Sequence, residues 1–425
     1  MGSAPKHRFE SGERLVGSGG KQKTIGSNDS IPMAIQNRQK KPSSRRKRIT
    51  TNGKPLQRPA TPGSKSREEN SDSPARGGGN DSDGEAKKRR KVNAAVRIND
   101  EVMSPNNRYF VKKKLGEGGF GAVYQVQARK RPPGMKTRIF ALKTEARGPN
   151  CPDRLKLEAT VLATINNCDD KVREHFAIMV DHCTTPVMNF IVMQLVGPSI
   201  QTIRDNVLHK EFSPSTALRI SIESLEAIRC LHVDVGYLHR DLKPSNLTIG
   251  VGKNFTRIIL IDFGISRKLF NKNNVIRLPR KEVKFMGTVR YACRRCHRHE
   301  EQGRQGDLES WFYVACDIYN QHVLPWRKVK ERDLTYALKN DLRENDGNNK
   351  CLNELLPHEF RDLMLYIDKL EYEDVPDYDY LNGVVQGCAT RTGVDLKQHF
   401  DWECFGPPPV GESEEDKTDN TPGAS

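Results

Sequence analysis

Apolar and polar residues alternate in short segments from about residue 107 onward, and this pattern predicts several secondary-structure elements. Two strand-like stretches, Tyr109–Leu115 and Ala122–Val126, flank a glycine-rich loop, and Phe140–Lys143 reads as a further strand that ends in lysine. Pro152 then signals the start of a helix. Farther along, Ile258–Ile261 is typical of a short buried strand. The pattern therefore predicts a folded region that contains both strands and helices.

A carboxylate lies on the apolar face of the predicted helix. Apolar residues recur there at helical spacing, at Leu155, Ala159, Leu162 and Ile165. Glu158 falls on the same stripe, and an inward-facing carboxylate needs a cationic partner to stay ionised. We expect this partner to be Lys143, which the pair would aim at the phosphates of a nucleotide.

The glycine-rich loop reads LGEGGFGAV and contains Gly116, Gly118 and Gly121 in the spacing G-x-G-x-x-G, followed by Val123. Glycines let a hairpin cover phosphate groups with exposed backbone N–H groups, because no Cβ stands in the way. A dinucleotide-binding turn has the same spacing, but it requires a helix directly after the loop. Because strand-like stretches lie on both sides here, the sequence favours a hairpin that covers phosphates.

A decapeptide at residues 237–246, YLHRDLKPSN, carries three chemically suitable side chains, Asp241, Lys243 and Asn246. Phosphoryl transfer requires a carboxylate to orient a hydroxyl, a cation near the moving phosphate and a ligand for magnesium. The decapeptide supplies all three residue types.

A second magnesium ligand is predicted where the strand Ile258–Ile261 ends in the sequence Asp262-Phe263-Gly264. Magnesium prefers oxygen ligands, and Asp262 together with Asn246 provides them. These parts follow one another in the order expected of a protein kinase.

The chain resembles eukaryotic protein kinases of the casein kinase I family, and within it the tau-tubulin kinase-like branch. Besides the motifs above, five strings support this resemblance: ALKTE at 141–145, VMQ followed by LVGPS at 192–199, GTVRYA at 287–292, PWRK at 325–328 and FDWE at 400–403. The match covers about residues 107 to 404.

The resemblance implies an α+β, two-lobed protein kinase fold. A twisted antiparallel sheet and the helix of Glu158 would form the N-terminal lobe, a larger helical lobe would follow, and ATP would lie between them. The expected domains are a disordered basic tail over residues 1–106, the kinase domain over 107–404, and a disordered acidic tail over 405–425. Asp307 resembles the buried aspartate that supports the catalytic loop.

The resemblance also implies a role for each site residue. Asp241 would orient the substrate hydroxyl and accept its proton, Lys243 would neutralise the transferred phosphoryl group, and Thr288 would hydrogen-bond near both. Asn246 and Asp262 would bind Mg²⁺. The expected ATP-contacting residues are Leu115, Gly116, Gly118, Gly121, Val123, Ala141, Lys143, Glu158, Met193 and Leu195, with Gln194 between the last two in the hinge.

The family's preference for acidic or already phosphorylated substrates implies an anion site at Arg290. Two departures from the family pattern bear on substrate choice and rate. Cys293-Arg294-Arg295 stands where the family has Ser-Ile-Asn, and Thr248 replaces an apolar residue at the adenine floor. Arg294 and Arg295 either face the substrate groove and strengthen the acidic preference, or point to solvent or pair with Glu300 and Glu301.

The basic residues are unevenly placed. The net charge is +16, and most of it lies in the first hundred residues, which are poor in aromatic residues and predicted to be disordered. Basic clusters at Lys40–Arg48 and Lys87–Lys91 are consistent with a solvated charge run, with nuclear import or with binding to a polyanion. Ser73, Thr61 and Ser104 each precede proline and are candidate phosphorylation sites.

No apolar run is long enough for a membrane span, and neither a secretory signal peptide nor a myristoylation signal is recognised. The ten cysteines lack disulfide-like spacing, so reduced thiols in the cytoplasm or nucleus are expected. We expect a monomer that acts on protein substrates.

Cys293, Cys296, His297 and His299 offer metal-ligand types, and a zinc site there is the alternative to a peptide-binding loop. Three function classes stay open: an active Ser/Thr kinase, a pseudokinase scaffold, and a binding protein that acts through its basic tail. A pseudokinase would lack at least one of Lys143, Asp241, Asn246 and Asp262, and none is missing. The sequence therefore favours an active kinase.

Overall fold

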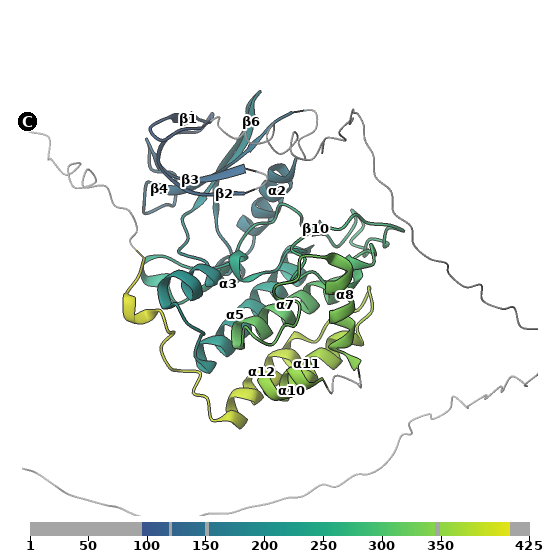
Figure 1. Ribbon diagram of the computed structural model, residues 1–425. Coiled ribbons are helices and arrows are strands. Elements are labelled where there is room, and N and C mark those ends of the chain that lie inside the picture. Colours follow the sequence, from purple (N-terminus) through teal and green to yellow (C-terminus); the bar gives the residue numbers. More distant parts are fainter. Residues whose placement is uncertain (1–95, 119–120, 149–152, 345–348, 409–425) are drawn as a thin grey trace, which may run out of the picture. The chain divides into compact units, whose positions relative to one another are not determined.

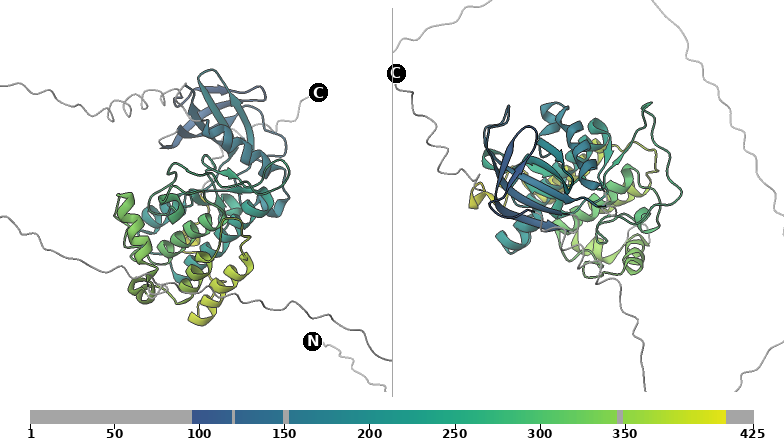
Figure 2. Two further views of the ribbon diagram at one scale, coloured as in Figure 1. Left: turned by 90° about the vertical axis from the view of Figure 1, so that its right-hand side faces the viewer. Right: turned by 90° about the horizontal axis from the view of Figure 1, so that it is seen from above.

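The computed structural model describes residues 96–118, 121–148, 153–344 and 349–408. The two basic clusters, Thr61, Ser73, Pro152 and the acidic segment 412–419 lie outside the described residues. Figures 1 and 2 show strands β1–β6 with helix α2 at one end of the described region and the remaining helices at the other. This arrangement is the two-lobed fold expected from the sequence, which is confirmed.

The N-terminal lobe is a six-stranded sheet in the order β1-β2-β3-β4-β6-β5, and all neighbouring strands are antiparallel. Its strands are β1 Glu101–Met103, β2 Arg108–Gly118, β3 Gly121–Ala128, β4 Ile139–Ala146, β5 Met179–Thr184 and β6 Met188–Gln194. In β3, Ala122, Tyr124 and Val126 are buried, as the period of two in a strand predicts. Strand β4 continues past Lys143, so the prediction that the strand ends at this lysine was wrong.

Strand β1 lies before the domain boundary expected at residue 107, and it pairs with β2. The turn after β1 is fixed to β5 by the buried carboxylate of Asp181. This carboxylate accepts hydrogen bonds from Ser104 Oγ at 2.5 Å, Asn106 Nδ2 at 2.9 Å and the Tyr109 hydroxyl at 2.7 Å. The segment that precedes the family resemblance is therefore part of the folded sheet.

Helix α2, Arg154–Asn166, packs against the sheet through Leu155, Glu158 and further buried side chains. Its first turn lacks a side-chain cap from Asp153. Instead, the carboxylate of Glu145 in β4 accepts hydrogen bonds from the N–H groups of Arg154 at 3.3 Å and Leu155 at 3.0 Å. These bonds satisfy donors that a helix leaves free at its start, and they tie α2 to the strand that carries Lys143.

The C-terminal lobe is mainly helical, with short strands near the catalytic segments. Its helices are α4 Ile200–Thr202, α5 Pro214–Cys230, α6 Arg294–His297, α7 Arg304–Tyr319, α8 Arg332–Asp341, α10 Lys350–Leu355, α11 Glu359–Asp368 and α12 Tyr378–Thr392. The short helix α3, Asp170–Arg173, connects α2 to β5. Single π-helical turns at Ile203–Leu208 and Leu231–Val235 follow α4 and α5. Its strands are β7 Tyr237–Leu238, β8 Leu247–Ile249, β9 Ile258–Leu260 and β10 Arg267–Lys268.

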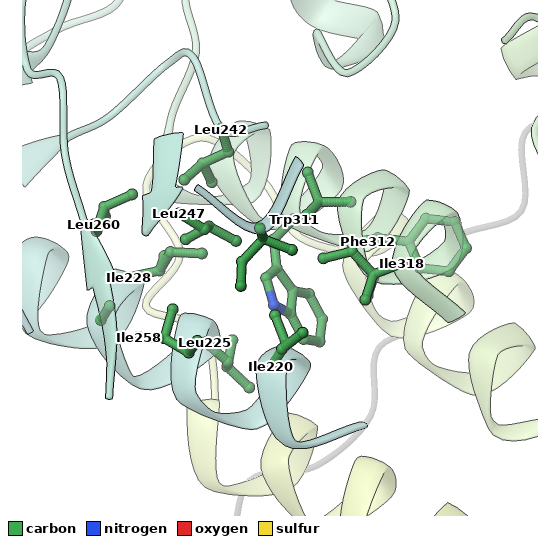
Figure 3. Close-up of a cluster of buried hydrophobic side chains, with 14 of the residues drawn as sticks. Ile220, Leu225, Ile228, Leu242, Leu247, Ile258, Leu260, Trp311, Phe312 and Ile318 are labelled. Atoms are coloured by element: carbon green, nitrogen blue, oxygen red, sulfur yellow. The ribbon is translucent and has the colours of Figure 1, made fainter. Parts of the chain in front are cut away.

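The core of this lobe is built around α5 and α7, which contact each other. Trp311 in α7 is buried among hydrophobic side chains (Figure 3). Its indole N–H donates to the Ser221 carbonyl and the Ser224 hydroxyl. Leu242 and Leu247 lie in the same cluster, on either side of Lys243 and Asn246. Burial of these two leucines therefore fixes the segment that carries the catalytic candidates.

Candidate active site

Asp307, near the start of α7, holds the backbone of the catalytic segment, residues 237–246. Its buried carboxylate accepts hydrogen bonds from the backbone N–H groups of His239 at 2.6 Å and Arg240 at 2.8 Å, and from His232 at 2.9 Å. Burial alone would raise the pKa of Asp307, but these bonds outweigh it and hold the pKa below its usual value. The supporting position expected for Asp307 is confirmed.

The backbone beside Asp241 is strained and closely packed. Arg240 has φ = 67°, a left-handed conformation that is unusual for a residue with a Cβ. Gly287 has φ = 101°, and a Cβ there would lie 2.8 Å from the Arg240 carbonyl oxygen. A glycine is therefore required at 287 for the following residue, Thr288, to come so close to Asp241.

Asp241, Lys243 and Thr288 form one hydrogen-bonded group. Thr288 Oγ1 donates to Asp241 Oδ1 at 2.8 Å, and Lys243 Nζ donates to Asp241 Oδ2 at 2.7 Å and to Thr288 Oγ1 at 3.3 Å. Asn246 Nδ2 donates to the Asp241 backbone carbonyl at 2.9 Å, which leaves the amide oxygen available to a metal ion. The structure thus brings together the four residues to which catalytic roles were assigned.

A second charged group joins the two lobes. Lys143 Nζ lies 2.6 Å from Glu158 Oε2 and 2.9 Å from Asp262 Oδ1, so the predicted pair of Lys143 and Glu158 is confirmed. Burial alone would lower the pKa of Lys143, but the two carboxylates outweigh it and raise the pKa. For Asp262, burial acts to raise the pKa, and Lys143 outweighs it, so that the pKa is lowered to about 2.

Asp262 is held in place by the residues around it. Its φ is 73°, again in the left-handed region. The preceding carbonyl, of Ile261, contacts His239 Nε2 at 3.0 Å, and the ring of Phe263 packs edge-on against His239 and Phe176. An ionised carboxylate and an amide oxygen are hard oxygen donors, so Asp262 and Asn246 fit a magnesium ion.

The expected nucleotide-contacting residues lie on adjacent strands. Val123 is opposite Lys143 in the β3–β4 pair, and Ala141 is opposite Met193 in the β4–β6 pair. Leu195 follows β6 in the connection between the lobes. These positions form one continuous surface of the sheet next to Lys143.

The glycine-rich hairpin is formed by the ends of β2 and β3, and its tip, residues 119–120, lies outside the described residues. Gly116 and Gly118 are exposed, and a Cβ on either would meet nothing. Gly121 differs, because a Cβ there would lie 1.7 Å from the Thr144 carbonyl oxygen. Leu115 is half exposed beside a register shift between β2 and β3. Of the three glycines, the structure therefore gives a steric reason only for Gly121.

Thr248 lies buried in β8, and its hydroxyl donates to the Ile259 carbonyl at 3.2 Å. Thr248 departs from the family pattern, and its hydroxyl group therefore has a hydrogen-bond partner within the β8–β9 pair.

Arg290 lies three residues after Gly287 and makes no ion pair with any described residue. Its guanidinium is 5.7 Å from the ring of Tyr291, and its backbone carbonyl accepts a hydrogen bond from the Trp326 indole at 2.8 Å. Its guanidinium also interacts with the hydroxyl of Tyr291.

Arg294 and Arg295 are engaged with other carboxylates. Arg294 bonds Glu309 at 2.9 Å and also contacts Asp368, while Arg295 bonds Glu371 at 2.9 Å and lies 3.8 Å from Glu300. Of the two alternatives left open by the sequence, the structure therefore shows pairing with carboxylates, and for Arg295 the partners include the anticipated Glu300. Pairing was anticipated with Glu300 and Glu301, but α7 and α11 supply the nearer partners of Arg294.

The zinc alternative fails on geometry. His299 Nδ1 contacts the Val283 carbonyl, and His297 stacks on Tyr336 instead of turning toward the cysteines. Among the described residues, the one group of three metal-ligand side chains that comes together is His175, Glu226 and Cys230. Arg229 already pairs with Glu226 there at 2.7 Å, which disfavours a further cation.

One charged cluster next to the site was missed in the sequence. The side chain of Glu301 is 1% exposed. Its carboxylate oxygens lie 2.5 Å from a guanidinium nitrogen of Arg280, 3.0 Å from one of Arg267 and 3.9 Å from one of Arg240. Burial alone would raise the pKa of Glu301, but the arginines outweigh it and lower the pKa. Only the adjacency of Arg240 to Asp241 hinted at such a cluster.

The comparison with known proteins agrees with this geometry. The protein kinase domain family matches residues 109–366. The Caenorhabditis elegans protein ZK507.1, named as a serine/threonine-protein kinase, is 33% identical over 268 residues, which cover 62% of this chain and 78% of that relative. The serine/threonine-protein kinase spe-6 of the same organism is 31% identical over 306 residues, covering 71% of this chain and 77% of the relative.

A Dictyostelium discoideum protein also named as a serine/threonine-protein kinase is 32% identical over 297 residues, which cover 70% of this chain and 56% of that relative. The chain therefore belongs to the protein kinase family. Protein kinases use ATP and divalent metal ions to phosphorylate proteins. No helix within the described ranges is both long and apolar enough to cross a membrane.

Proposed function

We propose that this protein is an active serine/threonine protein kinase that transfers the γ-phosphoryl group of ATP to Ser or Thr hydroxyls. The observation that carries the proposal is the group of Asp241, Lys243 and Thr288, in which both oxygens of one carboxylate are already oriented by hydrogen bonds. Asp241 orients the substrate hydroxyl and accepts its proton, and Lys243 neutralises charge on the moving phosphoryl group. Names of the relatives support the choice of Ser/Thr over Tyr.

The same proposal assigns the nucleotide and the metal. Lys143, held by Glu158, contacts the phosphates, while Val123, Ala141, Met193 and Leu195 enclose the base. Asn246 and Asp262 would hold Mg²⁺, which would supply charge neutralisation at the phosphate oxygens.

A direct assay tests the proposal. Purified protein is incubated with labelled ATP, MgCl₂ and an acidic casein-like protein, and the phosphorylated residues are identified. Labelled phosphoserine or phosphothreonine is expected. Binding of ATP without phosphorylation of any protein, the enzyme itself included, would favour the pseudokinase scaffold instead.

We further propose membership of the casein kinase I family, in its tau-tubulin kinase-like branch, with a preference for acidic or phosphorylated substrates. The strings GTVRYA, PWRK and FDWE support the assignment. The guanidinium of Arg290 forms no ion pair with a described residue, and this supports the preference, because Arg binds phosphate and carboxylate through two charge-assisted hydrogen bonds.

Replacing Arg290 by Ala is expected to reduce the preference for an acidic over a neutral peptide by about 10- to 100-fold, since a hydrogen bond to a charged group contributes about 1.5–3 kcal/mol. A peptide library measures this preference. Arg295→Ala is the matched control on the same loop, because Arg295 is already paired with Glu371. An unchanged preference in Arg290→Ala, or an equal loss in both variants, contradicts the assignment.

For localisation, we propose that the basic clusters of residues 1–100 direct nuclear import. A fusion of residues 1–100 to a fluorescent protein should accumulate in nuclei, and replacing Lys87–Lys91 by Gln should reduce that accumulation. An even distribution of the intact fusion would leave the tail as a spacer or as a polyanion-binding arm.

A further inference from the structure

Lys339 in α8 is a buried lysine without a carboxylate partner. Its side chain is 0% exposed, and it forms no ion pair with any of the described residues. Its Nζ donates to the backbone carbonyls of Val289 at 2.9 Å and Ala292 at 2.6 Å, and lies 3.2 Å from His297 Nε2. An ammonium group removed from water is costly unless it is fully hydrogen-bonded. The protein therefore stabilises this side chain with its backbone.

Aromatic rings complete the environment of the ammonium group. Lys339 Nζ lies 4.9 Å from the centre of the Tyr313 ring and 5.6 Å from that of Trp326. Both distances lie within the range of cation–π attraction. Three acceptors and two rings thus surround one ammonium group.

The segment that Lys339 holds is GTVRYA, residues 287–292. Trp326 donates its indole N–H to the Arg290 carbonyl, and the Tyr291 hydroxyl donates to Asp317 at 3.0 Å. The N–H groups of Tyr291 and Ala292 both donate to the Thr288 carbonyl at 2.9 Å. Lys339 and Trp326 together therefore bind the carbonyls of Val289, Arg290 and Ala292, directly after the threonine that contacts Asp241.

We propose that Lys339 is a positioning residue for substrate recognition. With Trp326, it fixes the backbone of residues 289–292, and thereby sets the positions of Thr288 beside Asp241 and of Arg290 beside the incoming peptide. The inference rests on the proposed kinase activity and extends it from the reacting groups to the support of the substrate-binding segment. Lys339 itself touches neither ATP nor the phosphorylated residue.

The protonation state of Lys339 links this support to pH. Burial lowers its pKa to about 7, against the opposing charge of Glu309. The ammonium form donates three hydrogen bonds, whereas the neutral amine has two N–H groups and loses its attraction to the rings. The titratable and charged groups around it are Cys293, Arg294, Cys296 and His297 of α6 and its cap, Glu309 and Tyr313 of α7, Arg332 and Tyr336 of α8, and Arg343.

The decisive variant is Lys339→Met, which keeps the length of the side chain and removes the charge and the donors. We expect its KM for an acidic peptide to rise about tenfold, because two buried carbonyls lose their donors. Its KM for ATP should stay within about twofold of the wild-type value, since the ion-paired group of Lys143, Glu158 and Asp262 includes no residue of this segment. Lys350→Met, at a lysine whose side chain is 81% exposed, is the matched control and should leave both constants unchanged.

The pH dependence separates positioning from a general effect on stability. Because the folded-state pKa of Lys339 lies below that of the unfolded chain, the contribution of this lysine to the free energy of unfolding rises with pH from about 7 to about 10.4. The hydrogen bonds from Lys339 to residues 289–292 weaken over the same pH range, since the ammonium form is lost as pH rises. Between pH 6 and 8.5, peptide KM should therefore increase in the wild type and stay flat in Lys339→Met. The peptide for this experiment lacks His, phosphate and a free amino terminus.

Two results would overturn the proposal. One is a folded Lys339→Met variant whose peptide KM, and the pH dependence of that KM, equal those of an active wild-type enzyme. If Lys339→Met does not fold, Trp326→Phe decides. This variant keeps an aromatic ring but removes the N–H donor to Arg290 and part of the ring beside Lys339. A folded Trp326→Phe with wild-type peptide KM is the second such result. An inactive wild-type enzyme, by contrast, would contradict the proposed kinase function itself.

Discussion

Replacement of Asp241 by Asn is expected to lower the rate of phosphoryl transfer by about 10²–10⁴, the usual contribution of a positioned acid–base group. The amide cannot accept the proton of the substrate hydroxyl, and it no longer offers a charged acceptor to Lys243 and Thr288. Nucleotide affinity should persist, because the group of Lys143, Glu158 and Asp262 is unchanged. Initial rates and the Kd of a fluorescent ATP analogue measure the two effects separately.

Asp234→Asn is the matched control for this experiment. Asp234 lies a few residues before Asp241 and is exposed, and its one ion pair with a described residue is a long contact with Arg229 at 3.4 Å. It should retain wild-type turnover. A loss of less than about tenfold in Asp241→Asn would remove the base from the mechanism.

Replacement of Glu301 by Gln is expected to lower the free energy of unfolding by about 3–5 kcal/mol, as is typical when one partner of a buried ion pair is removed. The variant would lack the carboxylate that pairs with Arg240, Arg267 and Arg280 in the wild type. Chemical denaturation at pH 7 measures the difference. Because the pKa of Glu301 is depressed in the folded state, the wild-type advantage is present above the ordinary Glu pKa and is lost as pH falls through the folded-state value.

The neighbouring residue provides the control. Glu300 pairs with Arg298 at 2.7 Å, and 42% of its side chain is exposed. Glu300→Gln should therefore cost no more than about 1 kcal/mol. Similar losses in the two variants would show that the cluster around Glu301 contributes no more than a surface pair.

The parts of the site that the sequence could predict are those carried by short motifs or by simple periodicity. Glu158 was recognisable because a carboxylate on an apolar helical stripe requires a cation, and Lys143 lay on the strand before it. The two-lobed fold followed from the resemblance that these motifs support. Here a local pattern and one nearby partner were sufficient.

Ion pairs between distant segments were not predictable in this way. Arg294 was expected to reach the groove or its sequence neighbours, yet its partners lie on α7 and α11. Lys339 was overlooked because its partners, too, lie far away in the sequence. Helix α8 is mainly polar, and only the packing of residues 289–292 against Lys339 shows that its ammonium group is buried. Such contacts depend on how helices cross, which the order of residues along the chain does not specify.

The cluster around Glu301 also has a consequence for control of the enzyme. Many kinases order the segment between the magnesium-binding aspartate and the substrate-binding loop by adding a phosphoryl group that arginines then bind. Here Arg240 belongs to the catalytic segment and Arg280 to that intervening segment. Both arginines pair with the carboxylate of Glu301, which is part of the chain itself. A phosphatase cannot remove this charge, and no upstream enzyme has to install it. Glu301 therefore offsets part of the charge of the three arginines as soon as the polypeptide folds.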